Sequence, residues 1–131
     1  MKAKHAADIM TQPVVTVGPN ALLTDAIELL LRHHVSGLPV VGNDDEMVGI
    51  ITEHDIINFA LSGNAADTRV EEAMTTEVIW MPPDAEVTAV INCLASRHLR
   101  RVPVVQGGKV VGIVSRRDVL REMLFMYSKY H

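Results

Sequence analysis

The fold of this chain follows from two stretches, residues 34–55, HVSGLPVVGNDDEMVGIITEHD, and residues 98–118, HLRRVPVVQGGKVVGIVSRRD. Each stretch has two β-branched runs on either side of a turn rich in Gly, Asn or Asp, a pattern that predicts a β-hairpin. The predicted strands are Leu38–Val41 with Met47–Ile51, and Val102–Val105 with Val110–Val114. After each hairpin, Thr52 or Ser115 begins a predicted helix, which ends near Leu61 in the first stretch and near Met126 in the second.

The two stretches belong to an internal duplication. A shift of 64 residues aligns the first copy with the second as far as the hairpin turn, which is one residue longer in the first copy, and a shift of 63 applies after it. Over residues 8–41 and 48–57, 16 of 44 aligned positions are identical, far more than chance gives. Fixed-period similarity of this kind indicates repeated structural units. We expect a first repeat at residues 1–61, a linker at 62–68 and a second repeat at 69–131.

Upstream of each hairpin the two copies also share one pattern. Short apolar stretches, Val14–Val17 and Val78–Met81, predict a strand, and Asn20 and Asp84 are the predicted N-caps of the helix that follows. The helices are expected to bury stripes with helical spacing, Leu23, Ala26, Ile27, Leu30 and Leu31 in one copy and Val87, Val90, Ile91, Leu94 and Ala95 in the other.

The sequence therefore predicts an α/β protein made of two β-α-β-β-α repeats. A unit of about 60 residues has a marginal core, so we expect the repeats to pack together as one compact module with pseudo-twofold symmetry. Such a module would contain two equivalent clefts between the repeats.

Composition narrows the function. The formal net charge of −4 argues against a general nucleic-acid binder. Residues 97–121 nevertheless hold seven basic residues and one acid, which fits either a local anion site or a solvated face. A single cysteine excludes an internal disulfide framework, and no apolar signal peptide is visible, so a cytoplasmic protein is expected. The sequence shows no catalytic triad, Walker motif or metal-ligand spacing, so we expect neither an enzyme nor a metal site.

The duplicated motifs resemble the cystathionine-β-synthase (CBS) repeat. The matching pieces are residues 34–41 and 48–55 in the first copy and residues 99–105 and 111–118 in the second, and the resemblance extends from Asp8 to about Leu124. It implies a Bateman module, a stand-alone pair of repeats similar to the nucleotide-binding repeats of the regulatory subunit of AMP-activated kinase. Such pairs bind AMP, ADP, ATP or S-adenosylmethionine as a regulatory ligand, form homodimers and signal to an effector protein.

Two aspartates are the sharpest candidate site residues. Asp55 and Asp118 end the motifs Gly-Ile-Ile-Thr-x-x-Asp and Gly-Ile-Val-Ser-x-x-Asp. A carboxylate at this place can accept hydrogen bonds from a ribose diol, and the start of a helix suits phosphate. The same Ser/Thr-x-x-Asp spacing also resembles a capping box, which stabilises a helix without any ligand. The two roles can coexist, one on each carboxylate oxygen.

The resemblance assigns further residues to two clefts. One would be formed by Thr52, His54, Asp55, Thr75, Ile79, Arg100 and Arg101, and the other by Thr11, Val15, Ser36, Gly37, Ser115, Arg116, Arg117 and Asp118. The arginine pair would face the ligand's phosphates, since a guanidinium binds phosphate bidentately. Because Ser36-Gly37 replaces that pair in the second cleft, the first cleft is expected to take the more anionic ligand. The alternative for the arginines is an exposed pair without a ligand.

Three other features leave alternatives open. Trp80, which aligns with Thr16, could pack internally, stack on an adenine or seal a subunit contact. Cys93 aligns with Leu29 and is expected in the core. Val119, Leu120, Met123, Leu124 and Tyr127 form an apolar stripe that suggests a homodimer contact, with a membrane-surface helix as the weaker interpretation. The alternative functions are a protein–protein adaptor with degenerate clefts, an S-adenosylmethionine binder and a nucleic-acid binder.

Overall fold

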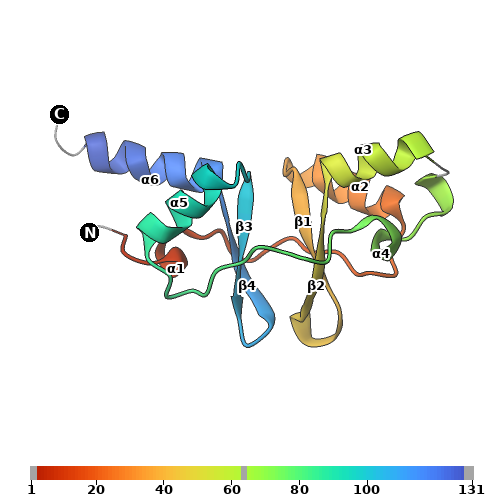
Figure 1. Cartoon of the computed structure of the whole chain (residues 1–131), viewed down its shortest axis with the longest axis horizontal. Coiled ribbons are helices and arrows are strands. Elements are labelled where there is room, and N and C mark those ends of the chain that lie inside the picture. Colours follow the sequence, from red (N-terminus) through yellow and green to blue (C-terminus); the bar gives the residue numbers. More distant parts are fainter. Residues whose placement is uncertain (1–2, 63–64, 129–131) are drawn as a thin grey trace. The chain divides into compact units, whose positions relative to one another are not determined.

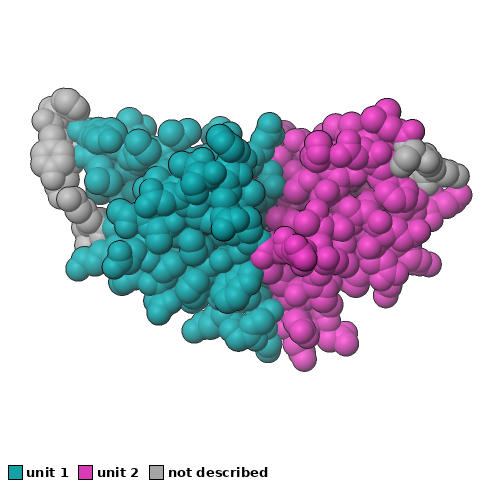
Figure 2. Space-filling view, in the orientation of Figure 1, with its two compact units in different colours: residues 1–14, 79–131 teal, residues 15–78 magenta. Residues whose placement is uncertain are grey.

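The chain divides into two compact units that do not follow the order of the repeats. The computed structural model describes residues 3–62 and 65–128. Unit 1 contains residues 1–14 and 79–131, and unit 2 contains residues 15–78 (Figure 2). Each unit therefore combines the hairpin and main helices of one repeat with the opening segment of the other. The predicted boundaries at 61 and 69 describe the duplication in the sequence, and residues 63 and 64 of the predicted linker lie outside the described part.

Unit 2 contains the first hairpin and its helices (Figure 1). Its elements are α2 (Leu23–His33), β1 (Gly37–Val41), β2 (Met47–Thr52), α3 (Glu53–Ser62) and α4 (Val70–Ala73), with short 3-10 turns at Asn43–Asp45 and Ala65–Asp67. Strands β1 and β2 pair antiparallel, with Leu38 opposite Ile51 and a bulge between Val40 and Val41.

Unit 1 has the corresponding arrangement. Its elements are α1 (Ala6–Ile9), α5 (Val87–Ser96), β3 (Arg101–Gln106), β4 (Lys109–Ser115) and α6 (Arg116–Ser128). Strands β3 and β4 pair antiparallel, with Val102 opposite Val114 and a bulge between Val104 and Val105. The predicted α/β class, both hairpins and the helices that follow them are confirmed.

The predicted first strand of each repeat is wrong, because only a single residue of each pairs with the hairpin. Val17 forms a parallel bridge with Val40, and Met81 forms one with Val104. The pairing does not extend back over the predicted residues, since the next N–H on the hairpin strand would have to come from Pro39 or Pro103, and proline has no N–H to donate to a strand ladder. It ends towards the helix because Gly18-Pro19 follows Val17 and Pro82-Pro83 follows Met81.

The opposite edge of each hairpin is paired by the other repeat. Thr75 forms an antiparallel bridge with Ile50 of β2, and Thr11 forms the equivalent bridge with Ile113 of β4. Backbone hydrogen bonds run both ways at each bridge, 2.8 and 2.9 Å at Thr75 and 2.8 and 3.2 Å at Thr11. These bridges attach the exchanged segments to the hairpins.

The predicted N-caps Asn20 and Asp84 are also wrong. Both lie in turns, and the N-cap positions are Leu22 for α2 and Glu86 for α5. In α2 the capping is done from inside the helix, because the Asp25 carboxylate accepts the Leu22 N–H at 3.0 Å. An acid in the first turn serves the exposed N–H groups in place of a polar N-cap side chain.

Each unit has its own aliphatic core. The fully buried residues in unit 2 include Leu23, Ala26, Leu38, Val40, Ile51 and Val70, and in unit 1 they include Ala6, Val90, Val102, Val104 and Val114. Cys93 is half-buried and packs against the core of unit 1, as predicted. The predicted stripes are too wide, because Leu31 is 71% exposed and Ala95 is also exposed. Within the described ranges, no helix is both long and apolar enough to span a membrane.

Candidate functional site

Asp55 lies at the start of α3 and binds groups from two other segments of unit 2, the end of β2 and the segment that contains Thr75. Its Oδ2 accepts hydrogen bonds from the Thr52 N–H and the Thr52 hydroxyl, both at 3.0 Å, and the Asp55 N–H donates to the Thr52 Oγ1 at 3.2 Å. Its Oδ1 accepts the Thr75 hydroxyl at 3.2 Å. The carboxylate therefore fixes the helix start with one oxygen and holds the exchanged segment with the other.

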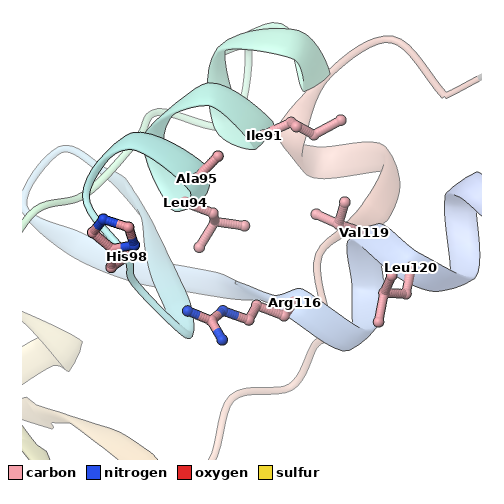
Figure 3. A pocket seen from close by; sticks show the side chains of 7 residues that line it. All are labelled: Ile91, Leu94, Ala95, His98, Arg116, Val119 and Leu120. Carbon is pink, nitrogen blue, oxygen red and sulfur yellow. The ribbon is translucent and has the colours of Figure 1, made fainter.

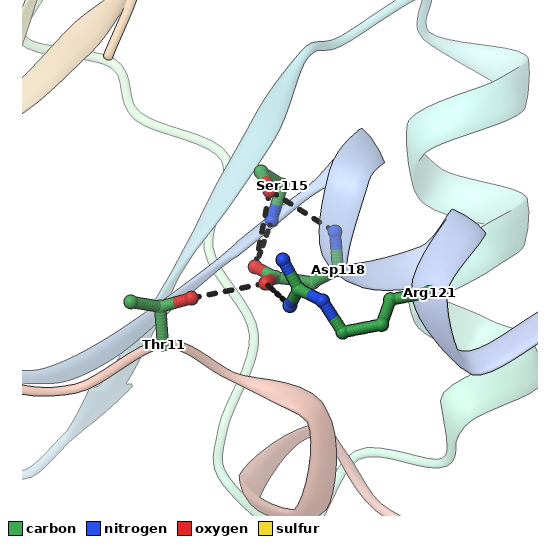
Figure 4. A network of polar contacts seen from close by, with 4 residues as sticks. All are labelled: Thr11, Ser115, Asp118 and Arg121. Carbon is green, nitrogen blue, oxygen red and sulfur yellow. Dashed lines mark hydrogen bonds and ion pairs between the residues drawn. The ribbon is translucent and has the colours of Figure 1, made fainter. Parts of the chain in front are cut away.

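Asp118 has the same place at the start of α6 in unit 1 (Figure 4). Its Oδ2 accepts the Ser115 N–H at 2.8 Å and the Ser115 hydroxyl at 3.1 Å, while Oδ1 accepts the Thr11 hydroxyl at 2.9 Å. Oδ1 also forms an ion pair with Arg121 at 3.0 Å. Asp118 is only 4% exposed, so this carboxylate is more enclosed than Asp55, which is half-buried.

The repeats differ at one position that the sequence analysis did not single out. Arg121 aligns with Asn58 in the first repeat. In unit 2 the Asn58 amide lies 3.0 Å from the His54 ring, whereas in unit 1 the Arg121 guanidinium reaches the aspartate itself. A basic residue three positions after an acid on a helix is a readable signal for such a pair. The second oxygen of Asp118 is therefore shared by two donors, and that of Asp55 by one.

The capping interpretation of the Ser/Thr-x-x-Asp motifs is confirmed, since both aspartates accept the N–H of the residue before the helix. The ribose role stays a prediction. Because a carboxylate oxygen can accept two hydrogen bonds, Asp55 Oδ1, with one donor, has capacity for another, whereas Asp118 Oδ1 already accepts two. At Asp55 that oxygen already faces a threonine hydroxyl, a group that can donate or accept.

The structure brings some of the predicted site residues together. Thr52, Asp55 and Thr75 are joined in unit 2, and Thr11, Ser115 and Asp118 are joined in unit 1. His54 and Arg117 occupy the second position of α3 and of α6 and are exposed. The remaining members lie in unit 1 (Ile79, Arg100, Arg101) or in unit 2 (Val15, Ser36, Gly37), and their assignment to clefts stays a prediction.

Arg116 has a structural task within unit 1. Its Nε donates to the Leu99 carbonyl at 2.9 Å, and its N–H donates to the Arg100 carbonyl at 3.0 Å. The side chain also lines a cavity of about 280 Å³ between α5 and α6, with Ile91, Leu94, Val119 and Leu120 (Figure 3). Arg116 is therefore engaged in contacts within unit 1, whereas its neighbour Arg117 is exposed.

A hairpin followed by a helix that an aspartate caps, present twice in one chain, defines a tandem-repeat module of the α/β class. The chain belongs to the CBS domain family, whose model matches residues 6–62 and 70–125. Among curated relatives, the A-adding tRNA nucleotidyltransferase of Geobacter sulfurreducens is 36% identical over 92% of this chain. The chain spans only 13% of that enzyme's length.

Two solved structures extend the comparison to ligands. The structure of CBSX2 in complex with AMP is 26% identical, with a TM-score of 0.86 over 95% of this chain and 99% of that one. The CBS domain pair of protein MJ0100 in complex with 5′-methylthioadenosine and S-adenosyl-L-methionine is 34% identical, with a TM-score of 0.80 over 95% of this chain and 97% of that one. CBS pairs are regulatory ligand-binding modules rather than catalytic ones.

Proposed function

We propose that this chain is a regulatory module that binds an adenosine-containing ligand, AMP, ADP or ATP, and signals to a partner protein. The ligands named for the two solved relatives have the adenosine part in common. Ligand binding would shift the population of conformations that the partner recognises, and this shift requires different ligand affinities in the two conformations. The cytoplasmic setting expected from the sequence is part of the same proposal.

One observation supports this proposal most directly, the environment of Asp55. Its carboxylate is held in a fixed orientation by the Thr52 N–H and hydroxyl, so it would not need to be ordered when a ligand binds. Its Oδ1 faces the exposed Thr75 hydroxyl at 3.2 Å. A ribose diol could donate to this oxygen, with Thr75 rotating its hydroxyl towards the ligand. Asp118 has less hydrogen-bonding capacity left for a ribose, because Arg121 and Thr11 both donate to its Oδ1.

The test is thermal unfolding with AMP, ADP, ATP, S-adenosylmethionine, NAD and an oligonucleotide. A ligand at 100 times its dissociation constant adds about 2.7 kcal/mol to the free energy of unfolding, which raises the midpoint by several degrees. We expect the adenosine ligands to do so. An adaptor with degenerate clefts predicts no shift with any of them. A nucleic-acid binder predicts a shift only with the oligonucleotide, which weakens steeply as salt is added.

In the same assay we expect Asp55→Asn to weaken AMP binding by about tenfold or more, because a hydrogen bond to a charged group contributes about 1.5–3 kcal/mol. The asparagine Oδ1 can still accept the Thr52 N–H, so the helix start is preserved. The matched control is the 2′,3′-dideoxy analogue of AMP, which lacks the diol. Binding of this analogue should fall much less in the variant. Equal losses for both ligands would rule out the diol contact.

We also propose that the chain forms a homodimer through the outer faces of α3 and α6. Large apolar side chains are exposed at corresponding positions, Ile57 at 62% and Leu61 at 84% on α3, and Leu120 at 61% and Leu124 at 69% on α6. Phe125 and Tyr127 extend the α6 face, and the cavity in Figure 3 opens beside Leu120. Exposed apolar surface of this extent is typical of a protein contact.

Sedimentation analysis tests the homodimer. We expect a dimer for the parent chain and a monomer for Leu120→Glu, because a buried charge at the centre of an apolar contact is strongly unfavourable. Val48→Glu is the control, since Val48 is an exposed apolar residue on β2 and not on a helix face. A parent chain that sediments as a monomer at all concentrations, or a Leu120→Glu dimer, would contradict the proposal.

A further inference from the structure

Unit 1 contains a cavity of about 510 Å³ that the proposed ligand site does not use. It lies where the start of α1, the segment before α5 and the end of β3 meet, and its lining includes His5, Asp8, Trp80 and Asp84. Trp80 is the only tryptophan of the chain and is 49% exposed. Internal packing, one of the three interpretations of this residue, therefore leaves half of its surface unexplained.

The cavity combines an aromatic face with two carboxylates. Asp8 is held in place because its Oδ2 accepts the N–H groups of Lys4 and His5, both at 2.9 Å. These backbone hydrogen bonds, that of Lys4 foremost, hold the pKa of Asp8 below its ordinary value. Asp84 is exposed on the turn before α5. A tryptophan face beside fixed negative charge attracts an organic cation, and a guanidinium both stacks on the ring and pairs with a carboxylate.

The equivalent place in unit 2 already holds a guanidinium. Arg69 aligns with His5, and its Nη1 donates to the Asn20 carbonyl at 2.6 Å, where Asn20 aligns with Asp84. The backbone frames correspond, because Arg69 bridges to Leu22 as His5 bridges to Glu86. The acids correspond as well, since Glu72 accepts the Arg69 N–H as Asp8 accepts the His5 N–H. In unit 1 a histidine stands at the position of Arg69, and Trp80 and Asp84 stand at the positions of Thr16 and Asn20.

We propose that the cavity at Trp80 binds an arginine side chain from a partner protein. The guanidinium would lie against the Trp80 ring and pair with Asp84 and Asp8. It would thereby occupy the position in unit 1 that corresponds to the position of the Arg69 guanidinium in unit 2. This site would give the module a docking contact for its effector, separate from the aspartates that begin α3 and α6. The inference does not depend on nucleotide binding, since none of the residues involved belongs to that site.

The test uses Trp80 as its own reporter. The full chain is titrated with acetyl-Gly-Arg-Gly-amide, and the tryptophan fluorescence is followed at low salt. We expect a saturable change with a dissociation constant of about 1 mM, a reasonable affinity for a single side chain. The same peptide with citrulline, which has the shape of arginine without its charge, should give no saturable change. Added salt should weaken the binding, because the pairs are exposed.

Two variants locate the binding. Asp84→Asn should weaken the arginine peptide about fivefold, the contribution of one exposed ion pair, whereas Glu86→Gln, a nearby acid outside the cavity lining, should change it less than twofold. His5→Arg should abolish binding, because it supplies the guanidinium from within the chain as Arg69 does. Unfolding midpoints are measured for each variant. Equal binding of the citrulline peptide, no saturable response, or a folded His5→Arg variant that binds like the parent would overturn the proposal.

Discussion

Asp118→Ala is expected to lower the free energy of unfolding by about 3 kcal/mol, whereas Asp55→Ala lowers it by about 1 kcal/mol. Both variants lose a helix cap. Asp118 is only 4% exposed and pairs with Arg121 as well as with a threonine hydroxyl, so its removal empties an enclosed place and leaves the half-buried Ser115 N–H without its acceptor. Unsatisfied buried donors have a large cost, and exposed ones can turn to water. The measurement is chemical denaturation of the two variants beside the parent.

Two further variants separate the causes. Arg121→Ala removes the ion pair alone, and because the Arg121 side chain is 69% exposed the loss should stay below about 1 kcal/mol. Asp118→Asn keeps an acceptor for the Ser115 N–H and should recover part of the stability. If Asp55→Ala and Asp118→Ala prove equally costly, the difference in enclosure has no energetic consequence. The comparison also bears on binding studies, since Asp118→Ala would lose affinity partly through unfolding.

The hairpins and their following helices could be predicted because local pattern determines them. β-branched runs such as Leu38–Val41 have one favourable partner across a short turn, and the Ser/Thr-x-x-Asp motif fixes where the next helix begins. The first strands and N-caps failed for the opposite reason. Whether the segment Val14–Val17 pairs through one residue or through all four depends on neighbouring prolines and on β1, which is distant in the sequence. The cap at Leu22 depends on the side chain of Asp25.

Exchange of the opening segments could not be predicted from either repeat alone. Thr11 and Thr75 align with each other, and their alignment says nothing about which hairpin each one joins. The resemblance grouped Thr75 with Asp55 and Thr11 with Asp118, and the structure joins both pairs by hydrogen bonds. Positions that break the symmetry needed the structure. The sequence shows Arg121 only as one of several basic residues, and the structure shows that its guanidinium pairs with Asp118. The sequence likewise leaves the role of Trp80 open, and the structure places it in the lining of a cavity.

Gly49→Ala is expected to lower the free energy of unfolding by about 3 kcal/mol, the upper part of the usual range for overpacking. Gly49 lies on β2, where the exchanged segment crosses it. A Cβ on Gly49 would lie 2.9 Å from the Thr75 carbonyl oxygen and 2.7 Å from the Met74 Sδ. The Met74 side chain can move, but the carbonyl belongs to the bridge with Ile50. Relief of the clash must displace Thr75, which also removes its hydroxyl from Asp55.

Two glycines provide the comparison. Gly18→Ala should change stability by less than about 0.5 kcal/mol, because a Cβ there has no neighbour within 4 Å. The three atoms nearest to a Cβ on Gly112 all belong to the Met10 side chain, with its Cγ at 2.7 Å, so the cost of Gly112→Ala should fall when Met10 is also changed to alanine. No backbone atom of the crossing segment is among the nearest neighbours there, so Gly112→Ala should cost less than Gly49→Ala. A Gly49→Ala variant as stable as the Gly18→Ala variant would mean that the segment with Thr75 does not cross β2 at this distance. The hydrogen bond between Thr75 and Asp55 would then be wrong as well.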